Sequence, residues 1–356
     1  MASRGRHGDA LLAGRMPSPR ELPVRTCFFC PPLRKPSGGM AVMAQLAAHL
    51  HAAGWPVAFV VNGEMPPGVS APDIPVLTLQ TAALAPGDRW IVPEGWPALL
   101  APGLQARCRC AVYVQNWAFV HGILPETVEW QKLGLRMFAV SSPVALFVRE
   151  TLGLAAPIVR PAIDTGLFSP APELRPDPAE ELRIAWMPRK NRHLAVQIRR
   201  IFESLVARAG RKPPVWIPIE NLPAADVAGV LRTAHVFLAT GFPEGFGLPP
   251  LEAMACGCLV AGFSGMGGWD YMRQALPRGF RPWFDLPEVP WGANGFFAAD
   301  GDVWGAAMAL GAACDRLLGG TAVEIVEAGI TAARWYSSTR QREELLGLWQ
   351  EQSYWR

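Results

Sequence analysis

Residues 244–252 read EGFGLPPLE and are followed directly by AMACGCLV. This stretch combines two carboxylates, Glu244 and Glu252, with a glycine-rich turn. Gly245 and Gly247 have no Cβ atom, so the backbone at both positions can approach a bound group closely. Such a turn beside two acidic side chains predicts a loop that cradles a ligand.

A helix is expected directly after the turn. The two prolines of the stretch fit a first helical turn, where absent N–H groups cost little, so we expect a helix at Pro249–Ala255 that stops at Gly257. Buried strands are expected on either side, at His235–Thr240 and Leu259–Phe263. The free N–H groups and positive dipole end of the helix favour an anion such as a phosphate. Ligands of such units bind beyond the carboxyl end of the strand.

The two glutamates are eight residues apart, one in the loop and one on the helix. We therefore expect no close pair that shares a proton, and each carboxylate is expected to accept hydrogen bonds from different hydroxyl groups. The alternative is a surface loop with a capping glutamate. Surface loops rarely combine this glycine pattern with an apolar strand on each side.

The stretch EGFGLPPLEAMACG (244–257) resembles the Glu-x7-Glu motif of the retaining glycosyltransferases of family 4 (glycosyl transferases group 1), which have the GT-B fold. Further segments resemble the same family in the same order. They are KPSGGMAVMAQLAAHLHAAGW (35–55), VRPAIDTGLFSP (159–170), LRIAWMPRKN (182–191) and NGFFAADGDVWGAAMAL (294–310). Five ordered segments are far more specific than a lone pair of glycines.

The resemblance implies an α/β GT-B fold. In this fold two Rossmann-like doubly wound domains face each other across a cleft, and a C-terminal helix crosses back to the first domain. The length agrees, because 356 residues are many for one core and sufficient for two α/β domains. We expect a disordered tail at 1–23, an acceptor-side N-terminal domain at 24–163, a nucleotide-sugar donor domain at 164–337 and the crossover helix at 338–356.

In the first domain, short apolar runs alternate with helical pieces, which is typical of a doubly wound sheet. A helix is expected at Met40–Ala53, because its apolar residues recur at helical spacing. Gly38 and Gly39 precede it, and their backbone N–H groups can face a phosphate across the cleft; a plain turn is the alternative. The expected strands are Arg25–Cys30, Pro56–Val61, Ile74–Leu79, Trp90–Val92, Cys110–Gln115 and Arg136–Val140.

The activity that the resemblance implies is transfer of a sugar from a nucleoside diphosphate sugar to an acceptor hydroxyl, with the anomeric configuration retained. The acceptor would be a glycan, a lipid-linked group or a small molecule in cell-surface polysaccharide or glycoconjugate synthesis, and peripheral contact with a membrane is compatible with this role. No protein nucleophile, metal ion or other cofactor is implied. Two alternatives stay open: a nucleotide-sugar epimerase or hydrolase of the same fold, and an inactive subunit that only binds the nucleotide sugar.

The resemblance also implies roles for single residues of the stretch. Glu244 would contact hydroxyl groups of the donor sugar, and Glu252 would contact those of the ribose. The rest of the donor-binding loop is Gly245, Phe246, Gly247 and Leu248.

Positive charge follows the apolar strand expected at Arg183–Met187 and suits a diphosphate. In the family, an arginine and a lysine about five residues apart hold this group, whereas here Leu194 stands five residues after Arg189. Arg189 is therefore the first candidate, and Lys190 or Arg192 would replace the family's lysine. A solvated basic loop is the alternative for each.

Polar residues also follow strands of the first domain. Gln115 and Asn116 are candidates for an acceptor or sugar contact, against the alternative of ordinary polar loop residues. Family members often carry a histidine soon after this strand, but here it ends in QNW, so no role passes to His121. Glu94 follows a strand too, and there a surface carboxylate is the commoner case.

Composition excludes several classes of protein. A net charge of +3 is too small to indicate a nucleic-acid-binding protein. No apolar run approaches the roughly 20 residues of a membrane span, and the N-terminus shows no apolar signal sequence, so we expect a cytoplasmic protein. Cys27, Cys30, Cys108 and Cys110 are four possible zinc ligands, but the first two lie in the apolar run TCFFC, which predicts a core strand with reduced cysteines.

Overall fold

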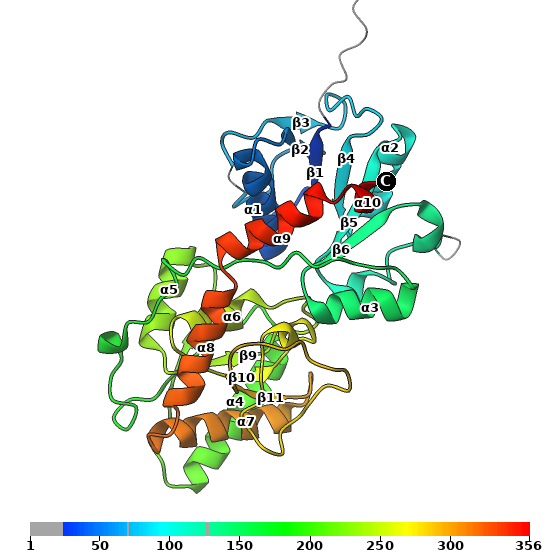
Figure 1. Cartoon of the computed structure of the whole chain (residues 1–356). Coiled ribbons are helices and arrows are strands. Elements are labelled where there is room, and N and C mark those ends of the chain that lie inside the picture. Colours follow the sequence, from blue (N-terminus) through cyan, green and yellow to red (C-terminus); the bar gives the residue numbers. More distant parts are fainter. Residues whose placement is uncertain (1–23, 70, 126–127) are drawn as a thin grey trace, which may run out of the picture.

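The computed structural model describes residues 24–69, 71–125 and 128–356. The tail predicted at 1–23 lies outside the described residues. The chain forms two α/β units, each built on one parallel sheet with helices packed around it, and the units stand one above the other in Figure 1. The predicted doubly wound architecture is thus confirmed.

The N-terminal unit contains a six-stranded parallel sheet in the order β3-β2-β1-β4-β5-β6. Its strands are apolar except for an arginine or threonine at one end of most of them, because helices cover both faces of a parallel sheet. The strands are β1 Thr26–Cys30, β2 Val57–Val61, β3 Val76–Thr78, β4 Arg89–Pro93, β5 Arg109–Val114 and β6 Arg136–Ala139. The helices are α1 Gly38–Ala52, α2 Leu100–Gln105 and α3 Ser142–Leu152.

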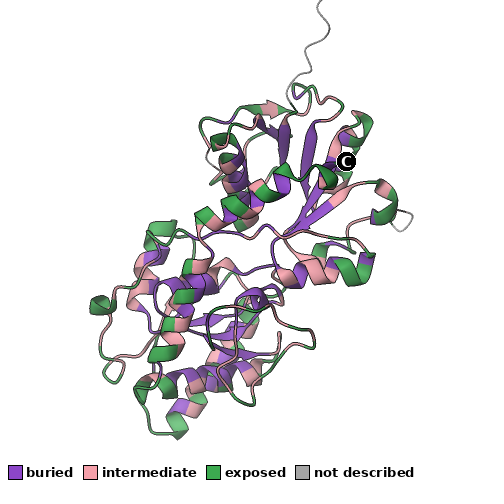
Figure 2. Cartoon of the chain, in the orientation of Figure 1, coloured by how far each residue is buried: buried purple, intermediate pink, exposed green. Residues whose placement is uncertain are grey.

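The C-terminal unit contains a five-stranded parallel sheet in the order β11-β10-β9-β7-β8. Its strands are β7 Arg183–Trp186, β8 Val215–Pro218, β9 Val236–Ala239, β10 Leu259–Phe263 and β11 Phe296–Ala298. Its helices are α4 Arg192–Arg208, α5 Ala224–Thr233, α6 Leu248–Ala255, α7 Val303–Leu318 and α8 Val323–Trp335. In Figure 2 most strands of both sheets are buried, and only the edge strands β3 and β8 lack buried residues, whereas most helices alternate buried and exposed residues.

Both sheets reverse their strand order next to their first strand. In the N-terminal sheet β1 lies between β2 and β4, and in the C-terminal sheet β7 lies between β8 and β9. The connections leave such a point in opposite directions and open a crevice at the carboxyl ends of the strands, where doubly wound proteins bind ligands. The loops after β1, β4, β7 and β9 are therefore placed to form a site.

The chain ends by returning to the N-terminal unit. Helix α8 packs on α6, and helix α9 (Ser338–Gln350) then lies against α1 (Figure 1). The crossover predicted as one helix is divided in two, because Glu351 is extended and a short helix α10 (Gln352–Trp355) follows. Trp355 on α10 is fully buried, so this second piece closes the core of the N-terminal unit.

The cysteines support the predicted core strand. Cys27 and Cys30 lie buried in β1, and burial raises the pKa of each thiol to about 12. Within the described ranges all seven cysteines are free. In the same part of the chain, no helix has both the length and the apolar composition needed to cross a bilayer.

Candidate functional site

A cavity of about 590 Å³ lies between the two units. It is bounded by the loops at the carboxyl ends of β1, β4, β7 and β9, as the switch points of the two sheets require, and by the start of α6. The structure brings together at this cavity all the predicted site residues except Gly245. They are Gly38, Gly39, Gln115, Asn116, Arg189, Lys190, Glu244, Phe246, Gly247, Leu248 and Glu252.

The donor-binding loop is shaped by glycine. Gly247 precedes α6 with a φ of 82°, a conformation that side chains other than glycine rarely adopt. The helix begins at Leu248, one residue before the predicted start, and Pro249 and Pro250 occupy its first turn as predicted. The N-terminal end of α6 therefore borders the cavity. Pro249 and Pro250 carry no N–H group, so an anion there would meet the N–H groups of Gly247 and Leu248 and the positive end of the helix dipole.

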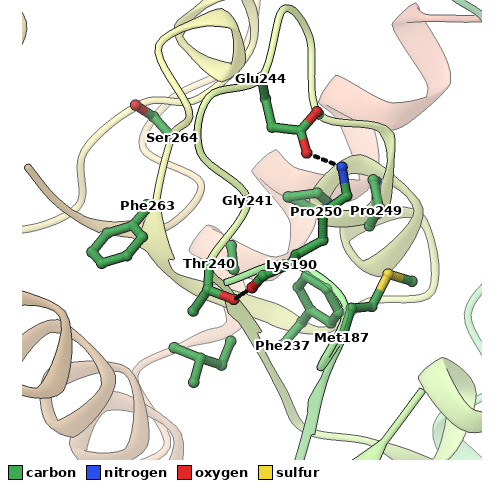
Figure 3. Close-up of a pocket in the computed structure, with 13 residues that line it drawn as sticks. Met187, Lys190, Phe237, Thr240, Gly241, Glu244, Pro249, Pro250, Phe263 and Ser264 are labelled. Atoms are coloured by element: carbon green, nitrogen blue, oxygen red, sulfur yellow. Dashed lines mark hydrogen bonds and ion pairs between the residues drawn. The ribbon is translucent and has the colours of Figure 1, made fainter. Parts of the chain in front are cut away.

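Glu244 is held in place by its backbone and its side chain. Its N–H donates to the carbonyl of Gly265 at 3.0 Å, and its carbonyl accepts from the N–H of Gly267 at 3.1 Å. Its carboxylate forms an ion pair with Nζ of Lys190 (Figure 3). Beneath this pair lies a cavity of about 20 Å³, bounded by Phe237 among others, which is room for about one water molecule.

The loop after β7 curls onto the end of β9. Asn191 adopts a left-handed φ of 56°, which asparagine tolerates better than most residues. Its Nδ2 donates to the carbonyls of Thr240 and Phe242, each at 2.8 Å. The hydroxyl of Thr240 donates to the carbonyl of Lys190 at 2.5 Å (Figure 3). These bonds fix the backbone that carries the basic side chains.

The basic side chains of this loop have different partners. Lys190 turns to Glu244, whereas Arg189 is exposed, lines the cavity and acts electrostatically on Glu252. Arg192, the other candidate for the missing lysine, pairs with Glu220 instead, and it is not among the described residues that line the cavity.

Glu252 is a partly buried carboxyl group on α6. Burial raises its pKa to about 7, and the nearby charge of Arg189 opposes that shift. Its charged form is therefore poorly solvated, and hydroxyl donors from a ligand would stabilise it.

Gln115 and Asn116 lie where the two units meet, and the side chain of Asn116 bonds across to the C-terminal unit. Nε2 of Gln115 donates to the carbonyl of Gly39 at 3.1 Å, and Nδ2 of Asn116 donates to the carbonyl of Pro243 at 3.1 Å. The carbonyl of Gln115 lies so close to Gly245 that an added Cβ there would stand 1.8 Å from it. Both amide side chains thus have hydrogen-bond partners within the protein, and these bonds help to hold the walls of the cavity in place.

Glu94 corrects an expectation, because the surface carboxylate expected after β4 is buried and only 4% exposed. Its carboxylate accepts hydrogen bonds from the N–H groups of Gln115 at 3.0 Å and Asn116 at 2.8 Å. It also lines the cavity, and burial raises its pKa to about 7. His121, by contrast, is exposed and packs against the ring of Phe147.

The side chains around the cavity form two chemical groups. Arg189, Lys190 and the start of α6 can bind an anion, and the carboxylates can accept hydrogen bonds from hydroxyl groups. In residues 24–69, 71–125 and 128–356, no group of three or more His, Cys, Asp or Glu side chains is arranged to hold a metal ion. The arrangement suits a ligand that carries both phosphate and hydroxyl groups.

Comparison with known proteins supports a glycosyltransferase of the GT-B fold. No family model matches the chain. The chain is 28% identical over 246 residues to an alpha-1,6-glucosyltransferase of Actinobacillus pleuropneumoniae serotype 7 (strain AP76), and the match covers 67% of this chain and 72% of that protein.

Solved structures show the fold. A glycosyltransferase from Rickettsia africae ESF-5 superposes with a TM-score of 0.64 at 14% identity, over 92% of this chain and 98% of that one. A sucrose-phosphate synthase from Thermosynechococcus elongatus superposes with a TM-score of 0.64 at 14% identity, over 93% of this chain and 99% of that one. The catalytic domain of starch synthase IV from Arabidopsis thaliana, bound to ADP and acarbose, superposes with a TM-score of 0.59 at 14% identity, over 94% of this chain and 99% of that one. The GT-B prediction is thus confirmed.

Proposed function

We propose that the protein is a retaining glycosyltransferase that moves a sugar from a nucleoside diphosphate sugar to an acceptor hydroxyl. The observation that carries the proposal is that Glu244, Glu252 and Arg189 border one cavity with the start of α6, between the two units. Anion-binding and hydroxyl-binding groups thus meet at the switch points of two doubly wound sheets. The similarity to an alpha-1,6-glucosyltransferase agrees with this reaction.

The donor would lie along the C-terminal side of the cavity. Glu252 would accept hydrogen bonds from the ribose, and the start of α6 with Arg189 would bind the diphosphate. Glu244 would hold the transferred sugar, with Lys190 beside it. The starch synthase of the same fold was solved with ADP, which is in line with a nucleoside diphosphate here.

Charge that develops on the leaving diphosphate would be stabilised by Arg189, Lys190 and the backbone N–H groups of α6. We assign no protein nucleophile, and an oxygen of the departing phosphate would take the acceptor proton. No metal ion or other cofactor is part of the proposal, so turnover is expected to survive treatment with EDTA. A cytoplasmic location and a role in cell-surface polysaccharide or glycoconjugate synthesis belong to the same proposal.

The test is release of nucleoside diphosphate from a panel of UDP-, GDP- and ADP-sugars, with and without a panel of acceptors. Acceptor-dependent release supports transfer, and NMR of the product must show the anomeric configuration of the donor. Release without acceptor would instead indicate a hydrolase, and a changed donor sugar an epimerase. Binding without release would indicate an inactive subunit.

A further inference from the structure

We propose that the N-terminal side of the cavity binds an uncharged carbohydrate as the acceptor, with a sugar ring against Trp96 and a hydroxyl group on Glu94. The inference rests on the proposed transfer reaction and specifies its acceptor. Charge is distributed unevenly around the cavity.

The cationic side chains that line the cavity come from one side only. Among the described lining residues, Arg189 and Lys190 belong to the C-terminal unit, and the N-terminal unit contributes no Arg, Lys or His. Its one ionisable lining residue is Glu94, and its other lining side chains are apolar or neutral. A phosphate placed against Glu94 would face this carboxylate, which is unfavourable where charge is poorly solvated.

Glu94 occupies a position equivalent to that of Glu244. It follows β4, the strand beside β1 at the switch point of the N-terminal sheet, as Glu244 follows β9 beside β7 in the other sheet. Asn116 connects the two positions, because its N–H donates to Glu94 and its side chain donates to Pro243, the residue before Glu244. A hydroxyl bound to Glu94 would thus lie on the N-terminal side of the cavity, near the loop that carries Glu244.

The carboxylate of Glu94 is oriented before any ligand arrives. Backbone N–H groups bind both of its oxygens, one each, and a carboxylate oxygen can accept more than one hydrogen bond. The residue is 4% exposed but lines the cavity, so its remaining lone pairs can accept from a donor there. Burial raises the pKa of Glu94 to about 7, so a hydroxyl donor relieves an existing cost and a second negative charge would add to it.

Trp96 supplies the apolar surface beside this carboxylate. It is partly buried and lines the cavity, and its ring packs against Phe29 of β1 with a centroid separation of 6.4 Å. A ring supported in this way offers a fixed flat surface to the C–H face of a sugar. The pair of a flat apolar ring and one oriented acceptor suits a neutral sugar.

Paired acceptors test the class of ligand. Methyl glycosides of glucose, galactose and N-acetylglucosamine would be compared with their 6-phosphates, by kcat/KM with the accepted donor and by saturation-transfer NMR with nucleoside diphosphate present. At least one neutral glycoside is expected to exceed its 6-phosphate by about tenfold in kcat/KM. Better binding of the 6-phosphates, or binding of none of the neutral glycosides, would overturn the proposal.

Variants of Trp96 test the place of binding. Trp96→Leu keeps apolar volume without the flat ring and is expected to raise the acceptor KM about tenfold, whereas Trp96→Phe restores most of the affinity. Donor KM and donor hydrolysis should change less than about twofold in both variants. Trp283→Leu is the matched control, because Trp283 is 86% exposed on the C-terminal unit. An unchanged acceptor KM in Trp96→Leu contradicts the proposal.

Glu94→Gln is expected to raise the acceptor KM about tenfold as well, with an unchanged Kd for nucleoside diphosphate. A loss of nucleoside diphosphate affinity would mean that Glu94 acts only by holding Gln115 and Asn116. If no donor is turned over at all, the transfer reaction fails, and the NMR comparison of the same glycosides with wild type and Trp96→Leu still decides whether this subsite exists.

Discussion

Glu244 and Lys190 neutralise each other at the cavity, so each depends on the other. We expect Glu244→Gln to lower kcat/KM by about tenfold to a thousandfold, the scale of one lost charge-assisted contact. Lys190→Met should lower it too, and the double variant should be little worse than the worse single one, because coupled neighbours are not additive. Steady-state kinetics of the three variants measure this, and strict additivity would mean that the two side chains act separately.

Arg189 has a different task. Its guanidinium can bind two phosphate oxygens at once, which an ammonium cannot, so Arg189→Lys should already be damaging and Arg189→Ala should cost about two orders of magnitude in turnover. Titration calorimetry should show the loss for nucleoside diphosphate and not for the nucleoside. Arg192→Ala is the control, because Arg192 pairs with Glu220 away from the cavity. Equal loss for both ligands would mean that Arg189 supports the fold instead.

Glu252 predicts a pH dependence. Its pKa is raised to about 7 by burial, and a folded-state pKa above the unfolded one stabilises the protein at low pH. This contribution is complete below about pH 4.5 and is lost as the pH rises through about 7. Thermal unfolding from pH 5 to 8 should therefore show a smaller decline in Glu252→Gln than in the wild type. An identical decline in both would contradict the assignment.

The residues of the site differ in how far sequence predicts them. Glu244 and Glu252 were predictable because one turn and one helix fix their relation, and such local geometry follows from glycine and proline positions. The burial of Glu94 was not, since it depends on Gln115 and Asn116, 21 and 22 residues later in the chain. The signal in the sequence is an acidic residue directly after a strand that is apolar except for Arg89.

At the scale of elements, the predicted strands and the predicted helices at Met40–Ala53 and Pro249–Ala255 match the structure to within a few residues, because their apolar runs and periods are strong. The observed ends of the elements differ from the predicted ones where tertiary contacts determine where an element begins. Helix α1 begins at Gly38 and not at Met40, and the second glycine of that turn lies against the side chain of Gln115, where an added Cβ would stand 2.0 Å from its oxygen. Sequence periodicity contains no information about such an approach.

The donor-binding loop yields a prediction about the closeness of the two units. At Gly245 an added Cβ would stand 1.8 Å from the backbone oxygen of Gln115, and a backbone atom cannot move aside as a side chain can. Gly245→Ala should therefore push the units apart, with an increase in the radius of gyration by small-angle scattering and a loss of activity of about a hundredfold or more. Gly229→Ala on α5 is the control, because no atom lies within 4 Å of its added Cβ. A compact, active Gly245→Ala protein would show that this contact is not required.

At the scale of the whole molecule, the resemblance predicted two units and a crossover but not the contact that joins them. Arg160, in the segment between the units, donates to Asp270 at 2.7 Å and to Glu344 of α9 at 2.8 Å. Asp270 also accepts from the N–H of Ser142 on α3 at 2.7 Å and from the hydroxyl of Tyr336 at 2.9 Å. One guanidinium thus connects both units with the crossover helix, through residues up to 184 positions apart.

We expect the contacts of Arg160 to contribute more to the free energy of unfolding than those of an exposed ion pair. The side chain of Asp270 is fully buried and that of Arg160 is 22% exposed, so Arg160→Met would leave a buried carboxylate without its cation, at a cost of about 3–5 kcal/mol. Arg211→Met is the matched control: its pair with Asp315 is 49% and 57% exposed and should contribute at most about 1 kcal/mol. Urea unfolding would compare the two variants.

The double variant Arg160→Met with Asp270→Asn separates a lost ion pair from lost packing. Removing the buried charge should restore part of the stability, because the penalty comes mainly from the unpaired carboxylate. Restoration of stability without restoration of turnover would further mean that the guanidinium fixes the relative position of the units, since that position brings Glu244 and Glu94 to the same cavity. If Arg160→Met unfolds no more easily than Arg211→Met, the crossover helix is held by contacts other than those of Arg160.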